Sequence, residues 1–300
     1  MLNHMTSPRV SFIVITHARA KRLVGALESI RRQTINSREI VVVVNGPDPE
    51  TEQLLRTLDF EVRVTILDSN YGVSGGRNAG IALARGEILF FLDDDAELRD
   101  PDTAAMALEH FDRDIDLGVV GLLAIDPTTG AVERRCLPFR NKRVPQGPTA
   151  ACYFAGCGCV IHRRVFNRVG PFDESLFYGG EELDLSYRLL EAGFRIIFDP
   201  LASVVHYRAG EFDKSRAPYF YARNRPWIAL RHLPLRYWVT HTFVWWAWSF
   251  VEGCRRQAMG AALRGMRDCV AGIPSRWRDR RPISGPTRRL LARNGGRLWY

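Results

Sequence analysis

The sequence has 300 residues, of which 46% are hydrophobic and 25% are charged, and this composition argues against intrinsic disorder. The net charge of +9 is unevenly distributed, because residues 1–206 hold 23 Lys+Arg against 28 Asp+Glu whereas residues 207–300 hold 19 against 5. All seven tryptophans also lie in the last third. We therefore expect two regions with different roles, one at 1–207 and a basic, Trp-rich helical region at 208–300.

The amino terminus and the cysteines bear on the compartment. The segment Met1–Pro8 lacks the basic start and apolar run of a secretory signal, which predicts that the chain stays in the cytosol. The six cysteines are then expected to remain thiols. The one close pair, Cys157 and Cys159, lacks the two-residue gap of zinc knuckles, so we expect buried strand residues here and not metal ligands.

The first hundred residues predict strands that alternate with helices. Apolar and β-branched runs predict strands at 10–16, 39–44, 62–67 and 87–92. Between them we expect a helix that ends at Gln33, a second at 49–58, a glycine-rich loop at 70–76 and a third helix at 77–85. Since these strands are too apolar to have a solvated face, the pattern predicts an α/β fold, a mainly parallel sheet with helices on both faces.

Polar residues follow several of these strands, namely Thr16, Asn45, Asp68 and Asp93–Asp95. In parallel α/β sheets, ligands bind beyond the carboxyl ends of the strands. We therefore expect these groups to converge on one crevice.

After residue 100 the pattern changes to mixed strands and loops. We expect strands within 117–125, 131–135, 150–161, 195–198 and 203–206, and a helix at 181–192.

The triplet Asp93–Asp95 brings three carboxylates together at a strand end. Their mutual repulsion must be offset by a cation or by hydrogen-bond donors. Mg²⁺ or Mn²⁺ bound with substrate phosphates would do this. A solvated acidic turn before a helix near Thr103 explains the triplet equally well.

The surroundings of the triplet resemble a known family. VSFIVITHARAKRLVGALESIRRQ and NYGVSGGRNAGIALARGEILFFLDDD are similar to the nucleotide-binding half of glycosyltransferase family 2, the inverting enzymes of the GT-A fold, which include rhamnosyltransferase-like enzymes of bacterial surface glycans. GCGCVIHRRVFNRVGPFDE, GGEELDLSYRLLEAGF, SVVHYRAG and YFYARNRPWIALR resemble its acceptor-side motifs, in the same order. The resemblance covers roughly residues 10–231. It implies that residues 1–207 form a catalytic domain, which divides near residue 100 into a nucleotide-binding half and an acceptor-side half.

The resemblance implies a set of nucleotide-sugar-binding residues around the base, the ribose and the donor. Val44 stands where the family usually has an acidic residue, which weakens the nucleoside recognition. The implied residues are Thr16, Arg19, Asn45, Asp68, Gly76, Arg77, Asn78, Asp93 and Asp94.

The resemblance also implies the chemical groups. Asp95 and His206 would hold a divalent metal, Mn²⁺ or Mg²⁺, although a lone histidine is often a structural hydrogen-bonding residue. Glu182, at the family's Glu-Asp-x-Asp position, would be the catalytic base, with Glu181 and Asp184 as less favoured alternatives.

The carboxyl-terminal region favours contact with a membrane surface through 226–300. Its cleanest apolar stretch, Tyr237–Val251, is shorter than the roughly 20 residues that span a bilayer, whereas tryptophan beside arginine suits anionic headgroups. The alternatives are a helical subdomain packed on the core or the interface of a homodimer. No recognised motif accompanies the basic residues, so nucleic acid is not expected as a partner.

Together these features predict an inverting glycosyltransferase at the inner face of the cell membrane. It would move a sugar from a nucleoside diphosphate sugar to a hydroxyl of a glycan or lipid-linked acceptor. The alternatives are a nucleotidyltransferase, whose glycine-rich signature after the first strand is missing, and a non-catalytic membrane-bound scaffold.

Overall fold

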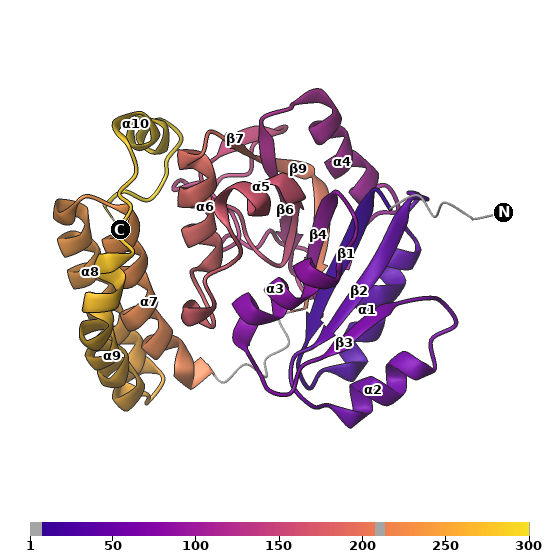
Figure 1. Cartoon of the computed structure of the whole chain (residues 1–300), viewed down its shortest axis with the longest axis horizontal. Coiled ribbons are helices and arrows are strands. Elements are labelled where there is room, and N and C mark those ends of the chain that lie inside the picture. Colours follow the sequence, from indigo (N-terminus) through magenta and orange to yellow (C-terminus); the bar gives the residue numbers. More distant parts are fainter. Residues whose placement is uncertain (1–7, 208–213, 300) are drawn as a thin grey trace.

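The computed structural model describes residues 8–207 and 214–299. One mixed sheet forms the centre of the molecule, with helices on both of its faces, and the carboxyl-terminal helices stand beside it in a separate layer (Figure 1). Within the described residues the sheet has nine strands, in the order β3-β2-β1-β4-β8-β6-β9-β5, with β7 paired to β9.

The amino-terminal half has the predicted alternation. Its four strands are parallel, because the connection between each strand and the next returns the chain to the same edge of the sheet. The strands are β1 (Val10–Thr16), β2 (Arg38–Val44), β3 (Arg63–Ile66) and β4 (Ile88–Asp93), and the helices are α1 (Ala20–Arg31), α2 (Pro49–Arg56) and α3 (Gly72–Leu83). The carboxyl ends of β1, β2 and β4 therefore meet at one edge.

The prediction of a glycine-rich loop at 70–76 is wrong for most of that segment, because α3 begins at Gly72. The glycines serve close packing: a Cβ on Gly76 would lie 2.7 Å from Cγ2 of Ile15, and one on Gly80 would overlap Cγ2 of Ile13. The missing side chains let α3 lie directly on β1, so the segment is a helix that needs glycine for contact and not for a turn.

The acceptor-side half adds antiparallel pairs to the sheet. β8 lies antiparallel between β4 and β6, whereas β9 runs parallel to β6 and pairs antiparallel with β5 and β7. The strands are β5 (Ala96–Leu98), β6 (Leu117–Ile125), β7 (Thr149–Ala151), β8 (Gly158–His162) and β9 (Arg195–His206), and the helices are α4 (Thr103–Arg113), α5 (Arg163–Val169) and α6 (Glu181–Glu191).

Two strand predictions in this half need correction. The two short strands expected at 195–198 and 203–206 form one strand, β9, whose pairing with β6 shifts register between Leu122 and Leu123. No strand forms at 131–135, where the chain makes only an isolated bridge between Ile125 and Val132. Cys136 then closes a turn by donating its N–H to the carbonyl of Glu133, which ends the pairing.

The carboxyl-terminal helices pack on the acceptor-side half. They are α7 (Ala217–His232), α8 (Leu235–Arg255), α9 (Met259–Arg278) and α10 (Gly285–Arg293). Ile228 and Leu233 belong to the same hydrophobic core as Leu183 of α6. Asn224 donates to the carbonyls of Leu176, Tyr178 and Gly179, each at 2.9 Å. The predicted boundary near Arg208 falls outside the described residues.

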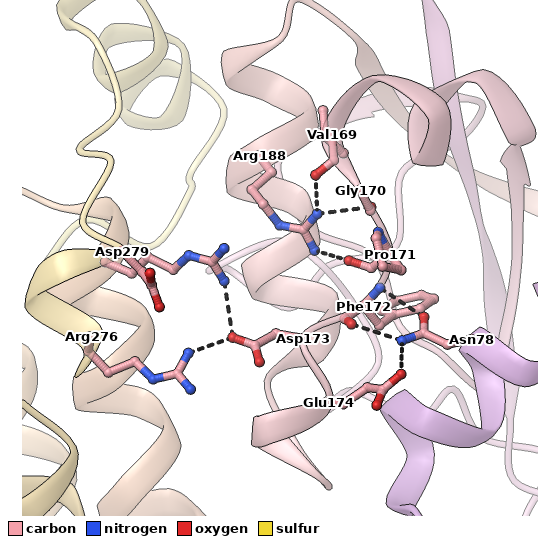
Figure 2. Close-up of a pocket in the computed structure, with 11 residues that line it drawn as sticks. Asn78, Val169, Gly170, Pro171, Phe172, Asp173, Glu174, Arg188, Arg276 and Asp279 are labelled. Atoms are coloured by element: carbon pink, nitrogen blue, oxygen red, sulfur yellow. Dashed lines mark hydrogen bonds and ion pairs between the residues drawn. The ribbon is translucent and has the colours of Figure 1, made fainter.

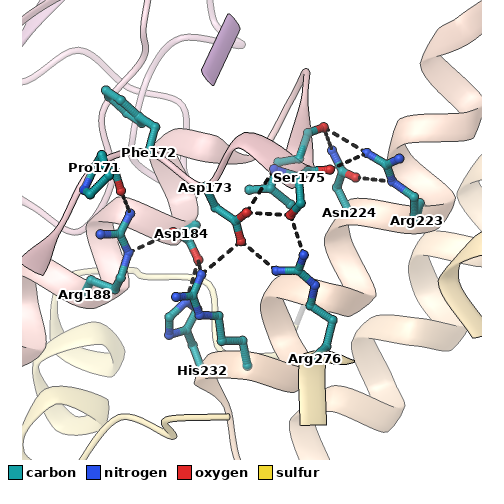
Figure 3. A network of polar contacts seen from close by, with 12 residues as sticks. Pro171, Phe172, Asp173, Ser175, Asp184, Arg188, Arg223, Asn224, His232 and Arg276 are labelled. Atoms are coloured by element: carbon teal, nitrogen blue, oxygen red, sulfur yellow. Dashed lines mark hydrogen bonds and ion pairs between the residues drawn. The ribbon is translucent and has the colours of Figure 1, made fainter. Parts of the chain in front are cut away.

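A buried polar network reinforces this contact (Figure 3). Asp184 of α6 accepts from Arg188 at 2.9 Å, contacts His232 of α7 at 2.7 Å and also pairs with Arg231. Asp173 is bound by Arg276 of α9 at 2.7 Å. These contacts join α6, α7 and α9, and they enclose Asp184 among Arg188, Arg231 and His232.

None of the helices in the described ranges combines the length and the apolar character that crossing a membrane requires.

Candidate active site

A cleft of about 950 Å³ opens at the carboxyl ends of β1, β2 and β4. Its other wall is formed by the segment before α6 and by the start of α7, so both halves of the sheet and the carboxyl-terminal helices contribute to it. Seven of the residues predicted for the site line this cleft: Thr16, Arg19, Asn45, Asp93, Asp94, Asp95 and His206.

Asp93, Asp95 and His206 form a cluster that can hold a metal ion. One ligand atom from each lies within 4.8 Å of the other two. The antiparallel pairing of β5 with β9 places Ala96 opposite His206, and His206 Nε2 lies 3.4 Å from Asp95 Oδ1. Two carboxylates and an imidazole suit Mn²⁺, and carboxylates with water suit Mg²⁺, so the donor set fits the predicted cofactor.

Charge is balanced in this cluster by Arg19 and His206. Arg19 Nη1 lies 3.0 Å from Asp94 Oδ1 and 3.3 Å from Asp95 Oδ2, so its side chain rests on the acidic triplet. Burial would lower the pKa of His206, but its bonds to Asp95, Cys136 and Glu133 outweigh this effect and raise the pKa to about 12. Burial raises the pKa of Asp94 to about 6 despite the attraction of Arg19. Without a cation, the acidic cluster thus holds positive charge and protons close to it.

Arg77 connects the triplet with α6. It is almost fully buried, and its guanidinium lies 3.5 Å from Asp93, 3.4 Å from Glu181 and 3.1 Å from Glu182. Burial alone would lower the pKa of Arg77, yet the three carboxylates raise it above its usual value. Gly156 leaves room for this contact, since a Cβ there would overlap Arg77 Nη2 and Glu182 Oε1. Arg77 is therefore a permanent cation between the two groups of carboxylates.

The two glutamates at the start of α6 lie in different environments. Burial and the repulsion of Glu182 raise the pKa of Glu181 to about 8, and among the described residues Glu181 Oε2 has no hydrogen-bond partner. The Glu182 side chain is 12% exposed against 4% for Glu181. Glu181 thus keeps its proton at neutral pH. Neither glutamate is among the residues that line the cleft. Glu182 is connected to it through Arg77, which also contacts Asp93.

At the carboxyl end of β2, Asn45 holds the loop that leads into α3. Its side chain donates to the carbonyl of Gly72 at 2.9 Å and accepts the N–H of Tyr71 at 3.0 Å. Asp68 is exposed beyond β3, bonded to the Tyr71 hydroxyl, and does not line the cleft. Gly76 lies within α3, where it packs against Ile15 and Asn45.

Asn78 lies away from the other predicted residues. Its side chain accepts the N–H of Phe172 and donates to the carbonyl of Phe172, both at 3.0 Å, and donates to Glu174 at 2.8 Å. It lines a second pocket, of about 460 Å³, between the segment 169–174 and α9 (Figure 2). Asn78 therefore holds the segment 169–174 in place and does not line the cleft at the carboxyl ends of β1, β2 and β4.

Several residues of the cleft were not predicted from the sequence. Glu133 lies in the segment 131–135, which was wrongly predicted as a strand, and Cys136 directly follows it; both approach His206. Phe177 and Tyr178 come from the turn before α6. The signal available for Phe177 and Tyr178 was the run of glycines that follows them, Gly179 and Gly180, both with positive φ. Nothing in the sequence pairs Cys136 with His206, because 70 residues separate them.

The parallel amino-terminal half, the mixed extension of its sheet and the acidic cleft between them are the features of a GT-A type glycosyltransferase fold. The family model "Glycosyl transferase family 2" matches residues 11–170. The chain belongs to glycosyl transferase family 2, and the predicted enzyme class is confirmed at the level of the family.

The relatives that this chain resembles are named as biosynthesis proteins or as glycosyltransferases. The chain is 30% identical over 221 residues to the succinoglycan biosynthesis protein ExoO of Rhizobium meliloti, covering 69% of this chain and 63% of ExoO. It is 28% identical over 251 residues to the O-antigen biosynthesis protein RfbC of Myxococcus xanthus, covering 74% of this chain and 19% of RfbC. An N-acetylglucosaminyl-diphospho-decaprenol L-rhamnosyltransferase of Mycobacterium tuberculosis is 29% identical over 97 residues, 31% of this chain and 32% of that protein. The chain thus spans less than two thirds of the length of these relatives.

A solved structure supports the fold. The mannosyltransferase PcManGT of Pyrobaculum calidifontis, in complex with GDP-Man and Mn²⁺, aligns with a TM-score of 0.57 at 18% identity, covering 96% of this chain and 80% of that one. The α/β fold predicted from the sequence is confirmed.

Proposed function

We propose that the protein transfers a sugar from a nucleoside diphosphate sugar to an acceptor hydroxyl, with inversion at the anomeric carbon. The observation that carries the proposal is the cluster of Asp93, Asp95 and His206, whose ligand atoms lie within 4.8 Å of one another in the cleft. PcManGT, which shares the fold, binds GDP-Man and Mn²⁺. The membership in family 2 favours this function over nucleotidyl transfer and over a non-catalytic scaffold.

The proposed donor site uses the carboxyl ends of the parallel strands. Thr16 and Asn45 would flank the nucleoside, and Asp93, with Asp94 in support, would face the ribose and diphosphate. Asp95 and His206 would hold Mn²⁺ or Mg²⁺, which when bound supplies positive charge for the leaving diphosphate. Arg19, which contacts Asp94 and Asp95, would meet the same phosphates. Asp68, Gly76, Arg77 and Asn78 are left out of this set of donor contacts, because none of them lines the cleft. Arg77 instead links Asp93 to Glu182.

The proposed base is Glu182. A base must be ionised before it takes the acceptor proton. Glu181 holds its own proton at neutral pH, and Asp184 is enclosed by Arg188, Arg231 and His232. Glu182 is the least buried of the three, with 12% of its side chain exposed, and Arg77 links it to Asp93. Arg77 orients it and offsets its charge.

The proposed acceptor is a glycan or a lipid-linked sugar, by analogy with ExoO, RfbC and the rhamnosyltransferase. We propose that residues 1–207 form the catalytic domain and that residues 226–300 of the carboxyl-terminal region contact anionic lipid. Apolar side chains of α8 remain exposed, with Phe243 at 70%, Phe250 at 52% and Trp248 at 46%. The excess of 14 positive charges in residues 207–300 matches an anionic surface and disfavours a homodimer through the same face. Such contact would place the protein at the inner face of the cell membrane.

A panel of nucleoside diphosphate sugars, with and without Mn²⁺, tests the function. We expect at least one donor to raise the melting temperature by mass action in the presence of metal. With that donor and a lipid-linked acceptor, NMR of the product should show the anomeric configuration opposite to that of the donor. A retained configuration would overturn the inverting mechanism, and stabilisation by no donor would overturn the proposed substrate class.

A further inference from the structure

Four side chains of types that ligate metals lie close together beside the acidic triplet: Glu133, Cys136, Cys157 and His206. The Sγ atoms of Cys136 and Cys157 are 3.9 Å apart. Glu133 Oε2 lies 3.3 Å from Cys136 Sγ and 3.2 Å from His206 Nδ1. A ligand atom from each of Cys136, Cys157 and His206 lies within 4.8 Å of the other two.

These separations match the edges of a tetrahedral zinc site. Zn–S bonds of about 2.3 Å give S···S edges of about 3.8 Å, and Zn–N and Zn–O bonds of about 2.0–2.1 Å give N···O edges of about 3.3–3.4 Å. A disulfide requires about 2.05 Å between the sulfurs. Both cysteines are free thiols in the structure.

We propose that Cys136, Cys157 and His206 Nδ1, with Glu133 as fourth ligand, form a second metal site that takes Zn²⁺ or another thiophilic divalent cation. Thiolates favour such cations, whereas Mn²⁺ and Mg²⁺ prefer oxygen. Glu133, Cys136 and His206 line the cleft, so an ion can enter from it, and Cys157 lies buried beneath them.

The strand geometry explains why Cys157 and not Cys159 takes part. Side chains two residues apart in an extended segment share a face, but Cys157 precedes β8 and Cys159 lies within it. Cys157 packs in the core cluster of Phe90 and Val160, and Cys159 in the cluster of Phe91 and Ile161. The two thiols therefore serve opposite sides of the sheet.

His206 is shared between the two sites. Its Nε2 faces Asp95 and its Nδ1 faces Glu133. A neutral imidazole has one N–H and one free lone pair, so it can ligate one metal at a time while it keeps its proton. Zinc at the thiol site would then withdraw His206 from Asp93 and Asp95 and inhibit transfer, a consequence that rests on the proposed function.

Titration of the reduced, metal-free full chain with Co²⁺ tests the site. We expect a sulfur-to-cobalt charge-transfer band and the visible bands of tetrahedral Co²⁺, both removed by Zn²⁺. Cys136→Ser, which changes a partly exposed residue, should weaken Co²⁺ binding at least tenfold and diminish the charge-transfer band, whereas Cys159→Ser should leave both unchanged. A spectrum without the band, or the same band in Cys136→Ser, would overturn the proposal.

Two further measurements separate this proposal from the proposed function. Zn²⁺ should raise the melting temperature of the unmodified chain and not that of Cys136→Ser, which tests the site without a variant at buried Cys157. At fixed Mn²⁺, Zn²⁺ should inhibit transfer in the unmodified chain at least tenfold more potently than in Cys136→Ser. Equal inhibition of both would overturn the sharing of His206. If no donor is turned over at all, the proposed function fails while the cobalt spectrum still decides the thiol site.

Discussion

Arg77 Nη1 donates to Glu182 Oε1 at 3.1 Å while Nη2 of the same guanidinium lies 3.5 Å from Asp93 Oδ1. One buried cation thus fixes the distance between the proposed base on α6 and the end of β4. The two carboxylates come from segments about 90 residues apart in the chain. A rigid link of this kind holds an acceptor-side group in register with the donor site.

Glu182→Gln tests the base. We expect kcat to fall about 10²–10⁴-fold with little change in the donor KM, because the amide keeps the shape and loses the ability to take a proton. The matched control is Glu181→Gln, which replaces a carboxyl that is protonated near neutral pH and should keep most of the activity. Steady-state rates over a donor titration decide the point. A large loss in Glu181→Gln together with near-normal rates in Glu182→Gln would reverse the assignment.

Asp95→Asn and His206→Ala test the metal site. Each should raise the Mn²⁺ concentration for half-maximal activity at least tenfold, because each removes a ligand from a cluster of three. The measurement is a Mn²⁺ titration of transfer after treatment with a chelator. Glu109→Gln, on the exposed face of α4, should leave the titration unchanged. Unaltered Mn²⁺ dependence in both ligand variants would place the metal elsewhere.

Asp184→Asn tests the network that joins α6 to the carboxyl-terminal helices. Removing the charge leaves Arg188 and Arg231 without their buried anionic partner. We therefore expect the free energy of unfolding to fall by roughly 3–5 kcal/mol at pH 7. Burial raises the pKa of Asp184, but His232, Arg188 and Arg231 outweigh it and hold the pKa well below the ordinary value of 3.8. A carboxyl with a lowered pKa stabilises the folded state above its unfolded pKa and loses this contribution as the pH falls towards the folded pKa.

Denaturant unfolding of both proteins between pH 7 and pH 3 measures this effect. The difference in free energy of unfolding should be constant above about pH 5 and should narrow below about pH 4. A difference that does not depend on pH would mean that the asparagine acts through packing alone.

Gly80→Ala tests the contact between α3 and β1. The added methyl group would overlap Cγ2 of Ile13. We therefore expect the free energy of unfolding to fall by about 1–3 kcal/mol, despite the higher helix propensity of alanine. The control is Gly260→Ala in α9, where the nearest atom is the flexible Arg264 Nη1 at 3.4 Å. That variant should be neutral or more stable by up to about 1 kcal/mol. Thermal unfolding of the two variants checks the contrast, and equal effects would contradict it.

Phe243→Ser combined with Trp248→Ser tests the proposed membrane face. Burial of each side chain in the headgroup layer contributes about 1.5–3 kcal/mol, so the double variant should bind anionic vesicles at least tenfold more weakly. Flotation with vesicles that contain anionic lipid measures this. Ile115→Ser is the matched control, because Ile115 is 78% exposed on the catalytic half and should not affect binding. If neither the unmodified chain nor the Ile115→Ser control binds the anionic vesicles, the proposal is wrong.

The periodic part of the fold could be predicted from the sequence. Val10–Thr16 and Leu117–Ile125 were predicted with the bounds that the structure shows, because buried β-branched runs have few alternatives to a strand. The segment at 72–76 was predicted as a loop because glycine disfavours helices. Tertiary contact outweighs local helix propensity here, because the helix can lie against Ile13 and Ile15 only where glycine leaves out the Cβ atom.

The sequence by itself determined which residues are candidates for the chemistry: the aspartates after β4, the glutamates that begin α6 and the histidine that ends β9 all lie in recognisable local patterns. Their partners were decided by the tertiary structure alone. Arg77 faces Glu182, Arg19 rests on Asp94, and Cys136 meets Cys157 and His206, because sheet pairing brings together segments between which local sequence carries no information. A strand end predicts where a group lies, but only the packing of neighbouring elements decides which charge it meets there.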